Sequence, residues 1–219
     1  MPDWVGPVAE YVLEVGLKET LKLAVVSVLA STVIGIALGT LLTIRWLPVR
    51  APIRLYIEVW RGLPIVVTIL FIYFSLPTFE IRFSAYTAAA IGLSLWGSAQ
   101  VAEATRGAVQ SIPREQHEAA AALGFGWVGR HVFVILPQAL RRLLPPLVGL
   151  LVNVIQNTTV AFVIGVAETL QASQRQVERL TLETGDPHAF EIFAAVMVLF
   201  FLISFPLTRL ARYLERRLV

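Results

Sequence analysis

The sequence contains no cysteine, and only 15% of its 219 residues are charged. The lack of cysteine excludes disulfide bonds, thiolate metal sites and cysteine nucleophiles. A soluble domain usually carries about 25% charged residues, so the charges here are too few to cover a water-exposed surface. With 57% hydrophobic residues and a mean hydropathy of +0.73, the composition is typical of a membrane protein.

Several classes of function lack their characteristic residues. Lysine occurs only at Lys18 and Lys22, and neither lies in a Gly-x-x-x-x-Gly-Lys-Ser/Thr phosphate loop with which the chain would hydrolyse ATP. The three histidines, His117, His131 and His188, are too far apart for a local metal motif, and we expect them at surfaces or interfaces. No constellation of nucleophile and base is evident, which argues against an enzyme. The net charge of +3 is too small to indicate nucleic-acid binding.

Five stretches are long and apolar enough to span a membrane, which takes about 20 residues of helix. They are Leu21–Ile44, Leu55–Leu76, Tyr86–Val109, Leu143–Val166 and Phe190–Leu210. Residues 4–17 are apolar but short and carry Glu10 and Glu14, which predicts an amphipathic helix on the outer surface. We therefore expect an all-α polytopic membrane protein with about five transmembrane helices, forming a single domain over residues 1–219.

Basic residues gather in alternate loops, and short loops rich in arginine and lysine stay in the cytoplasm. These bases follow the first span, lie between the third and fourth spans, and end the chain: Arg45, Arg50, Arg54, Arg106, Arg114, Arg130, Arg141, Arg142, Arg209, Arg212, Arg216 and Arg217. Their positions predict that the N-terminus is outside and the C-terminus inside. The segment Glu168–Pro187 is then an outer loop, whose charges we expect on a solvated helix face.

The first span carries a small residue at every fourth position, namely Ser27, Ser31, Gly35 and Gly39. This spacing places a ridge of minimal side chains along one helix face, against which another helix backbone can pack closely. The pattern indicates packing in a bundle of several helices, and no chemistry.

The loop between the third and fourth spans, residues 110–142, carries the most informative pattern. Ser111 and Pro113 favour the start of a helix, a run of alanines sustains it, and Gly124 and Gly126 end it. A short rigid helix is thus presented to the cytoplasm. Its nearly flat alanine face suits docking into a groove on a partner protein.

This loop resembles the EAA loop of ABC-importer permeases. Glu118-Ala119-Ala120 is followed, at the spacing of that family, by Gly124 and by Val134-Ile135-Leu136-Pro137, with Val134 where the family has Ile. The similarity extends over nearly the whole chain and is closest to permeases for polar amino acids. It rests on Glu58–Pro64, Ile72–Phe74, Leu76-Pro77, Arg106-Gly107, Gln110–Pro113, Leu136–Arg142, Pro145-Pro146, Ile164–Val166 and Glu168.

The resemblance implies a type I ABC-importer permease in a bacterial or archaeal inner membrane. The residues expected to couple to the ATPase are Glu118, Ala119, Ala120, Gly124, Leu136 and Pro137. The implied partners are two cytoplasmic ATPases, an extracytoplasmic amino-acid-binding protein, and a second copy of the chain or a sister permease. This chain itself would need no cofactor, because ATP and Mg²⁺ would be bound by the ATPase.

Polar residues within the fourth span are candidates for the substrate path, because polar groups at lipid depth tend to face a cavity or another helix. They are Asn153, Gln156, Asn157, Thr158 and Thr159. Helix-helix hydrogen bonds are an equally good explanation. In the family this region often carries Glu, Lys and Asp, which are replaced here by neutral residues including Leu150 and Asn157. The resemblance therefore favours a neutral or acidic amino acid over a basic one.

A gate or hinge is expected near the start of the second span. Pro64 lacks a backbone donor and Gly62 permits bending. Glu58 and Arg61, three residues apart, could pair and so reduce the cost of burial. The leading interpretation is an ATP-driven permease; the alternatives left open are a secondary transporter or channel that acts without ATP, and a membrane enzyme or scaffold.

Overall fold

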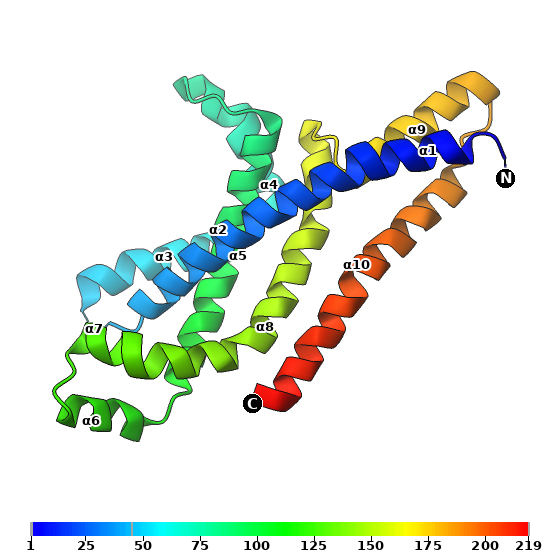
Figure 1. Ribbon diagram of the computed structural model, residues 1–219. Coiled ribbons are helices and arrows are strands. Elements are labelled where there is room, and N and C mark those ends of the chain that lie inside the picture. Colours follow the sequence, from blue (N-terminus) through cyan, green and yellow to red (C-terminus); the bar gives the residue numbers. More distant parts are fainter. Residues whose placement is uncertain (1, 45, 219) are drawn as a thin grey trace. The chain divides into compact units, whose positions relative to one another are not determined.

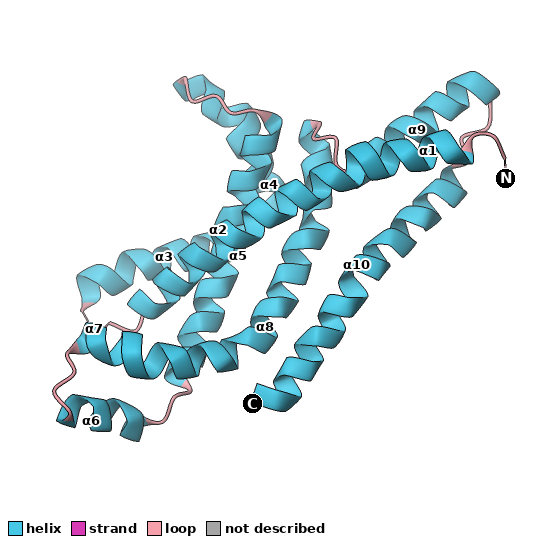
Figure 2. Ribbon diagram, in the orientation of Figure 1, coloured by secondary structure: helices cyan, strands magenta, loops and turns pink. Residues whose placement is uncertain are grey.

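The computed structural model describes residues 2–44 and 46–218; Arg45, one of the bases used to orient the chain, lies outside this part. Within it all regular structure is helical (Figure 2), as the composition predicted. In chain order the elements of Figure 1 are α1 (Val5–Tyr11), the π-helix η1 (Val12–Leu17), α2 (Lys18–Leu41), α3 (Leu47–Gly62), α4 (Ile65–Leu70), the π-helix η2 (Phe71–Ser75), the 3₁₀-helix η3 (Leu76–Phe79), α5 (Ala85–Gln110), α6 (Arg114–Ala122), α7 (Trp127–Arg130), the π-helix η4 (His131–Ile135), α8 (Leu136–Asn157), the 3₁₀-helix η5 (Thr158–Ile164), α9 (Thr169–Thr184) and α10 (Ala189–Leu218).

The helices contribute to two compact units. Unit 1 comprises Met1–Leu29, Leu63–Ser94 and Val152–Pro206, and unit 2 comprises Ala30–Gly62, Leu95–Leu151 and Leu207–Val219. Because α2, α5, α8 and α10 each supply residues to both units, the division does not cut the chain into sequential domains. The expectation of one transmembrane domain stays a prediction.

Three helical runs in the described residues are long and apolar enough to cross a membrane: Val5–Leu41, Trp127–Ile164 and Ala189–Leu218. A fourth crossing arises if α3 and the segment Ile65–Phe79 together form one broken span. The third expected span lies within α5, which is continuous but is not among these runs. The total of five spans and the orientation of the chain therefore stay predictions.

Two boundaries differ from those expected. The helix runs without interruption from Val5 to Leu41, so the surface helix expected over residues 4–17 is not a separate element. The second expected span, Leu55–Leu76, is not one continuous helix, because α3 ends at Gly62 and α4 begins at Ile65. Pro64 has extended backbone, with φ −62° and ψ 129°, and a proline disfavours helical geometry in the residue before it. The chain is thus broken at the position where the sequence predicted a bend.

In unit 2, helices α2 and α5 approach each other closely at the ridge of small residues. A Cβ atom added at Gly35 would lie 2.5 Å from the Cβ of Val101, and one added at Gly39 would overlap the carbonyl oxygen of Ala102. No side chain larger than hydrogen fits at either position while the helices keep this separation. The predicted packing role of these two glycines is confirmed.

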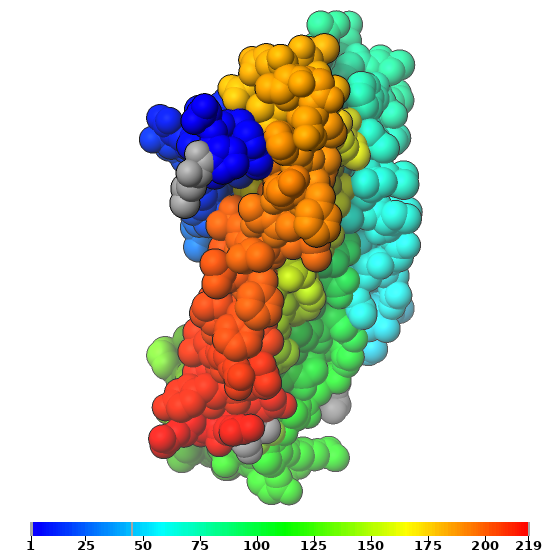
Figure 3. Space-filling view, turned by 90° about the vertical axis from the view of Figure 1, so that its right-hand side faces the viewer, coloured from blue at the N-terminus to red at the C-terminus, as the bar shows by residue number. Residues whose placement is uncertain are grey.

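In unit 1, the N-terminal helix packs along α9. Val8 and Val12 form an apolar cluster with Leu180 and with Ile192 of α10. Figure 3 shows the same neighbourhood as blue atoms beside orange ones. Only 11% of the most apolar stretch of α10 is buried, which leaves a long apolar surface for lipid or another protein.

The start of α9 depends on a buried carboxylate. Glu168 is fully buried, and its carboxylate oxygens accept hydrogen bonds from the backbone N–H groups of Leu170 (2.8 Å) and Gln171 (2.9 Å). These bonds cap the helix, whose first amides have no partner within it. Burial raises the pKa of Glu168 to about 7, and the two backbone hydrogen bonds oppose that rise.

We predict that Glu168 makes the folded protein less stable as pH rises. Its pKa is raised from 4.5 to about 7, so between these values the folded state holds a proton that the unfolded state has released. The stability that this group contributes is fully present below pH 4.5 and is lost as pH rises through about 7, a change of roughly 3 kcal/mol. Glu168→Gln should remove this decline in denaturation experiments on the detergent-solubilised protein.

The matched control is Glu183→Gln, since Glu183 lies on the same helix with a side chain that is 58% exposed. It should follow the wild-type pH dependence. Parallel wild-type and Glu168→Gln curves between pH 4.5 and 7 would show that the carboxylate ionises without a burial cost.

Candidate functional site

The helix expected between the third and fourth spans is present as α6. Pro113 precedes it with ψ 144°, and Gly124 follows it with φ +82°, a left-handed conformation that glycine adopts without strain. The predicted start and end are confirmed. Glu118 and Ala119 are exposed, whereas Ala120 is buried. The first two residues of the motif thus lie on the outer face of the helix, and the third packs against the rest of unit 2.

The outer surface around α6 combines charge with exposed apolar side chains. Arg114 Nε lies 3.2 Å from Glu118 Oε1, one turn along the helix, and both side chains are mostly exposed. Leu123, Val128 and Phe133, which follow along the loop, are 77%, 66% and 70% exposed. Leu123 is thus available to a partner protein, while Val128 and Phe133, at the start of the apolar run Trp127–Ile164, are available to a partner or to lipid.

Hydrogen bonds hold α6 against the following helices. Arg142 of α8 donates from Nη1 to the carbonyl oxygen (2.5 Å) and the hydroxyl (3.1 Å) of Ser111, just before α6. Gln138 donates to Gln116 Oε1 at 3.3 Å. Leu136 and Pro137, expected in the coupling loop, are the first two residues of α8. Leu136 and Pro137, the last residues of the EAA-type motif, therefore begin α8, and side chains of α8 hold α6 in place.

His117 lies on the inner side of α6. Its ring is 6.1 Å from that of His131, and desolvation, followed by the neighbouring His131 and Arg130, lowers its pKa. His131 is only 4% exposed, which corrects the expectation of histidines at surfaces or interfaces. The ring stacks on Trp127, at 4.1 Å between centroids, and four residues along a helix bring two side chains to one face. The Trp-x-x-x-His spacing was the signal in the sequence that would have found this pair.

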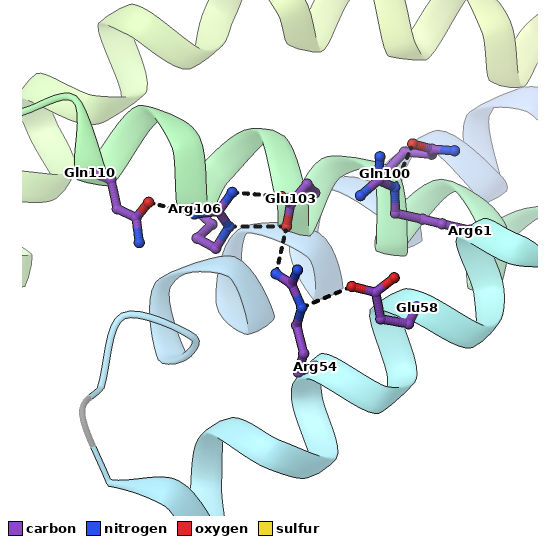
Figure 4. Close-up of polar contacts among 7 residues, drawn as sticks. All are labelled: Arg54, Glu58, Arg61, Gln100, Glu103, Arg106 and Gln110. Atoms are coloured by element: carbon purple, nitrogen blue, oxygen red, sulfur yellow. Dashed lines mark hydrogen bonds and ion pairs between the residues drawn. The ribbon is translucent and has the colours of Figure 1, made fainter.

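A network of charges joins α3 to α5 in unit 2 (Figure 4). Arg54 lies between two carboxylates, with Nε 2.9 Å from Glu58 and Nη1 3.7 Å from Glu103. Arg106 donates two hydrogen bonds to the Glu103 carboxylate, from Nε to Oε2 (3.0 Å) and from Nη2 to Oε1 (2.6 Å), and it also donates to Gln110. Glu103 is thus paired with Arg106 of its own helix and with Arg54 of α3.

The expected pair of Glu58 and Arg61 is wrong. Glu58 instead pairs with Arg54 one turn earlier, while Arg61 Nε donates to Gln100 Oε1 of α5 at 3.3 Å. Residues four apart on a helix lie on one face, so Arg54 reaches Glu58 without distortion. Gly62 meets no neighbouring atom at its Cβ position, so steric crowding does not require glycine there. A gating role for these residues and Pro64 stays a prediction.

The polar cluster of the fourth span lies at the end of α8, in unit 1. Gln156 Nε2 donates to Ser204 Oγ of α10 at 3.2 Å, which is a helix-helix hydrogen bond, and Asn157 donates to the carbonyl of Asn153 at 2.7 Å. The hydroxyls of Thr158 and Thr159 donate to carbonyls of the preceding turn. Asn153 and Gln156 are exposed and Thr158 is buried. Gln156 thus takes part in helix packing, yet its side chain and that of Asn153 are exposed at the surface of the chain.

Comparisons with known proteins agree on one family. The family described as "Binding-protein-dependent transport system inner membrane component" matches residues 31–219. The glutamine transport system permease protein GlnP of Escherichia coli K12 is 38% identical over 220 residues, 99% of this chain and 97% of its own length. A probable amino-acid ABC transporter permease of Bacillus subtilis, YckA, is 40% identical over 161 residues, 74% of this chain and 71% of its own.

Solved structures show the same fold. The crystal structure of an amino acid ABC transporter with histidines aligns over 100% of both chains, with a TM-score of 0.83 and 29% identity. An inward-facing methionine ABC transporter, MetNI, aligns over 93% of this chain and 96% of its own with a TM-score of 0.71; at 21% identity it supports the fold alone. The chain belongs to the family of binding-protein-dependent transport system inner membrane components.

Proposed function

We propose that this chain is the permease subunit of an ATP-driven importer for polar amino acids. The observation that carries the proposal is the EAA-type loop folded as an exposed α6, braced by α8 and surrounded by exposed apolar side chains. Relatives named as glutamine and amino-acid permeases, over nearly the full chain in the case of GlnP, support the substrate class.

In this proposal, α6 docks on a cytoplasmic ATPase that binds ATP and Mg²⁺. A second copy of the chain or a sister permease completes the translocation path, and an extracytoplasmic binding protein delivers the amino acid. The site of action is the inner membrane of a bacterium or archaeon. Purification of the chain from its native host, with identification of the proteins that accompany it, tests this assembly; a chain that transports alone, without ATP, would be a secondary transporter or channel.

We predict that Glu118→Lys abolishes transport and the stimulation of ATPase activity in reconstituted vesicles. The substitution places a second positive charge one turn from Arg114, on an exposed face that we assign to the ATPase. The matched control is Glu183→Lys, which reverses the charge in the same i,i+4 pairing, Arg179 with Glu183, on α9. Normal stimulation in Glu118→Lys would remove α6 from the coupling role.

We predict that Asn153, Gln156 and Asn157 line the translocation path. Replacing each in turn by Leu should lower the transport rate or shift substrate preference, because amides can bond both the carboxylate and the ammonium group of an amino acid. Copurification with the ATPase should be unchanged. Gln174→Leu, on α9, is the control, since Gln174 bonds Glu178 of its own helix. Normal transport by all three variants would assign the cluster to packing.

We predict that neutral polar and acidic amino acids are carried in preference to arginine, lysine and histidine. A cationic side chain in a low-dielectric bundle needs a nearby carboxylate. Leu150 and Asn157 supply none, and both Glu58 and Glu103 are already paired with arginines. Competition uptake assays in vesicles measure the preference; arginine or histidine displacing glutamine, glutamate and asparagine would contradict it.

A further inference from the structure

His131 is a buried polar residue at the junction of three segments of unit 2. It begins the π-helix η4, packs against Trp127 of α7, and lies next to His117 of α6. Its Nε2 atom lies 3.2 Å from the hydroxyl oxygen of Thr43, which comes just after the end of α2. The expected coupling and substrate residues include neither His131 nor Thr43.

Both ring nitrogens of His131 have partners that fix its proton. Nδ1 lies 2.9 Å from the carbonyl oxygen of Trp127, which can only accept, so Nδ1 is the donor. In the neutral ring Nε2 is then an acceptor, to which the Thr43 hydroxyl can donate its single proton. The imidazole is thereby anchored to α7 by one nitrogen and bonded to the end of α2 by the other.

Thr43 has a second acceptor for the same proton. Its hydroxyl oxygen lies 2.7 Å from the carbonyl oxygen of Thr40, in the last turn of α2. When His131 moves away, the hydroxyl can donate to Thr40 instead, so no buried donor is left without a partner. A lost hydrogen bond is costly mainly when it orphans a buried group, so the cost of opening this contact falls on Nε2 of His131 and not on the Thr43 hydroxyl.

His131 and its neighbour Arg130 are linked to α6. Arg130 Nη1 lies 3.5 Å from the carbonyl oxygen of His117, and the two histidine rings meet edge to face, at 64°. Beside this contact an open groove of about 550 Å³ lies between one face of α2, including Ile36 and Thr40, and the side chains of Trp127 and Val132. A displacement of α6 can thus carry His131 relative to α2 without breaking a close-packed core.

We propose that His131 is a positioning residue that transmits displacement of α6 to the cytoplasmic end of α2 through its releasable hydrogen bond with Thr43. The inference rests on the proposed function, in which an ATPase displaces α6. It adds a specific route: α6 moves His131, the Thr43 hydroxyl exchanges His131 for Thr40, and the end of α2 is freed from η4.

The test measures ATP hydrolysed per glutamine transported by the complete transporter in proteoliposomes, with ATPase and binding protein present. Thr43→Val keeps the shape of the side chain and removes its hydroxyl, and His131→Phe keeps a ring on Trp127 and removes both bonds. Each should raise the ratio about two- to tenfold, the equilibrium factor that one hydrogen bond supplies. The double variant should be no worse than the stronger single variant, because both remove the same bond.

Two further variants separate the hydrogen bond from packing. Thr43→Ser retains a hydroxyl and should restore the wild-type ratio. Thr181→Val removes a hydroxyl that bonds within α9 and should leave the ratio unchanged. If His131→Phe does not assemble, the comparison of Thr43→Val with Thr43→Ser still decides the matter.

The outcomes distinguish this inference from the function on which it rests. A wild-type complex that shows no ATP-driven uptake contradicts the proposed function. A wild-type complex that is coupled, with a normal ratio in Thr43→Val, overturns the role of the bond alone. Effects of Thr43→Val and His131→Phe that multiply in the double variant also overturn it, because the residues then act independently.

Discussion

Unit 2 depends on the backbone contact between α2 and α5. Gly35 and Gly39 leave no space for a side chain, so α5 lies against α2 at a separation set by backbone atoms. From that position, Ala102 of α5 joins Leu42 and Ile57 in an apolar cluster. The same placement brings Glu103 within reach of Arg54 on α3. Van der Waals packing of small residues thus decides where the charged side chains of unit 2 can meet.

The charges of Arg54, Glu58, Glu103 and Arg106 in unit 2 are arranged in opposite pairs. An unpaired ion removed from water costs several kcal/mol or more, and a partner with good geometry reduces that cost. Arg106 binds Glu103 with two nitrogens, and Arg54 lies between Glu103 and Glu58. With both carboxylates engaged by arginines, unit 2 offers a cationic substrate little attraction from these residues. The network therefore bears on substrate choice although we assign it no direct contact with substrate.

The region around α6 combines firm and releasable contacts. Arg142 and Gln138 of α8 hold the start of α6, and the two ring nitrogens of His131 contact Trp127 of α7 and Thr43. A helix that transmits motion must stay attached to the neighbouring helices when it is displaced. At least one of its contacts must also break without leaving a buried donor unsatisfied. Thr43, with one acceptor in η4 and another in the last turn of α2, meets this second requirement.

The sequence by itself determined the all-helical membrane class, because apolar runs of about 20 residues have the length of a membrane-spanning helix, whose backbone groups are all bonded within it. Local signals also determined α6 between Pro113 and Gly124, and the close packing at Gly35 and Gly39. Only the tertiary structure decided which charges pair, since Glu58 had arginines at both three and four residues' distance and a further helix to contact. It alone buried His131 beside Thr43, 88 residues away, and Glu168 at the start of α9. Spacing along one helix predicts neighbours on that helix, whereas partners on other helices depend on how the backbones pack.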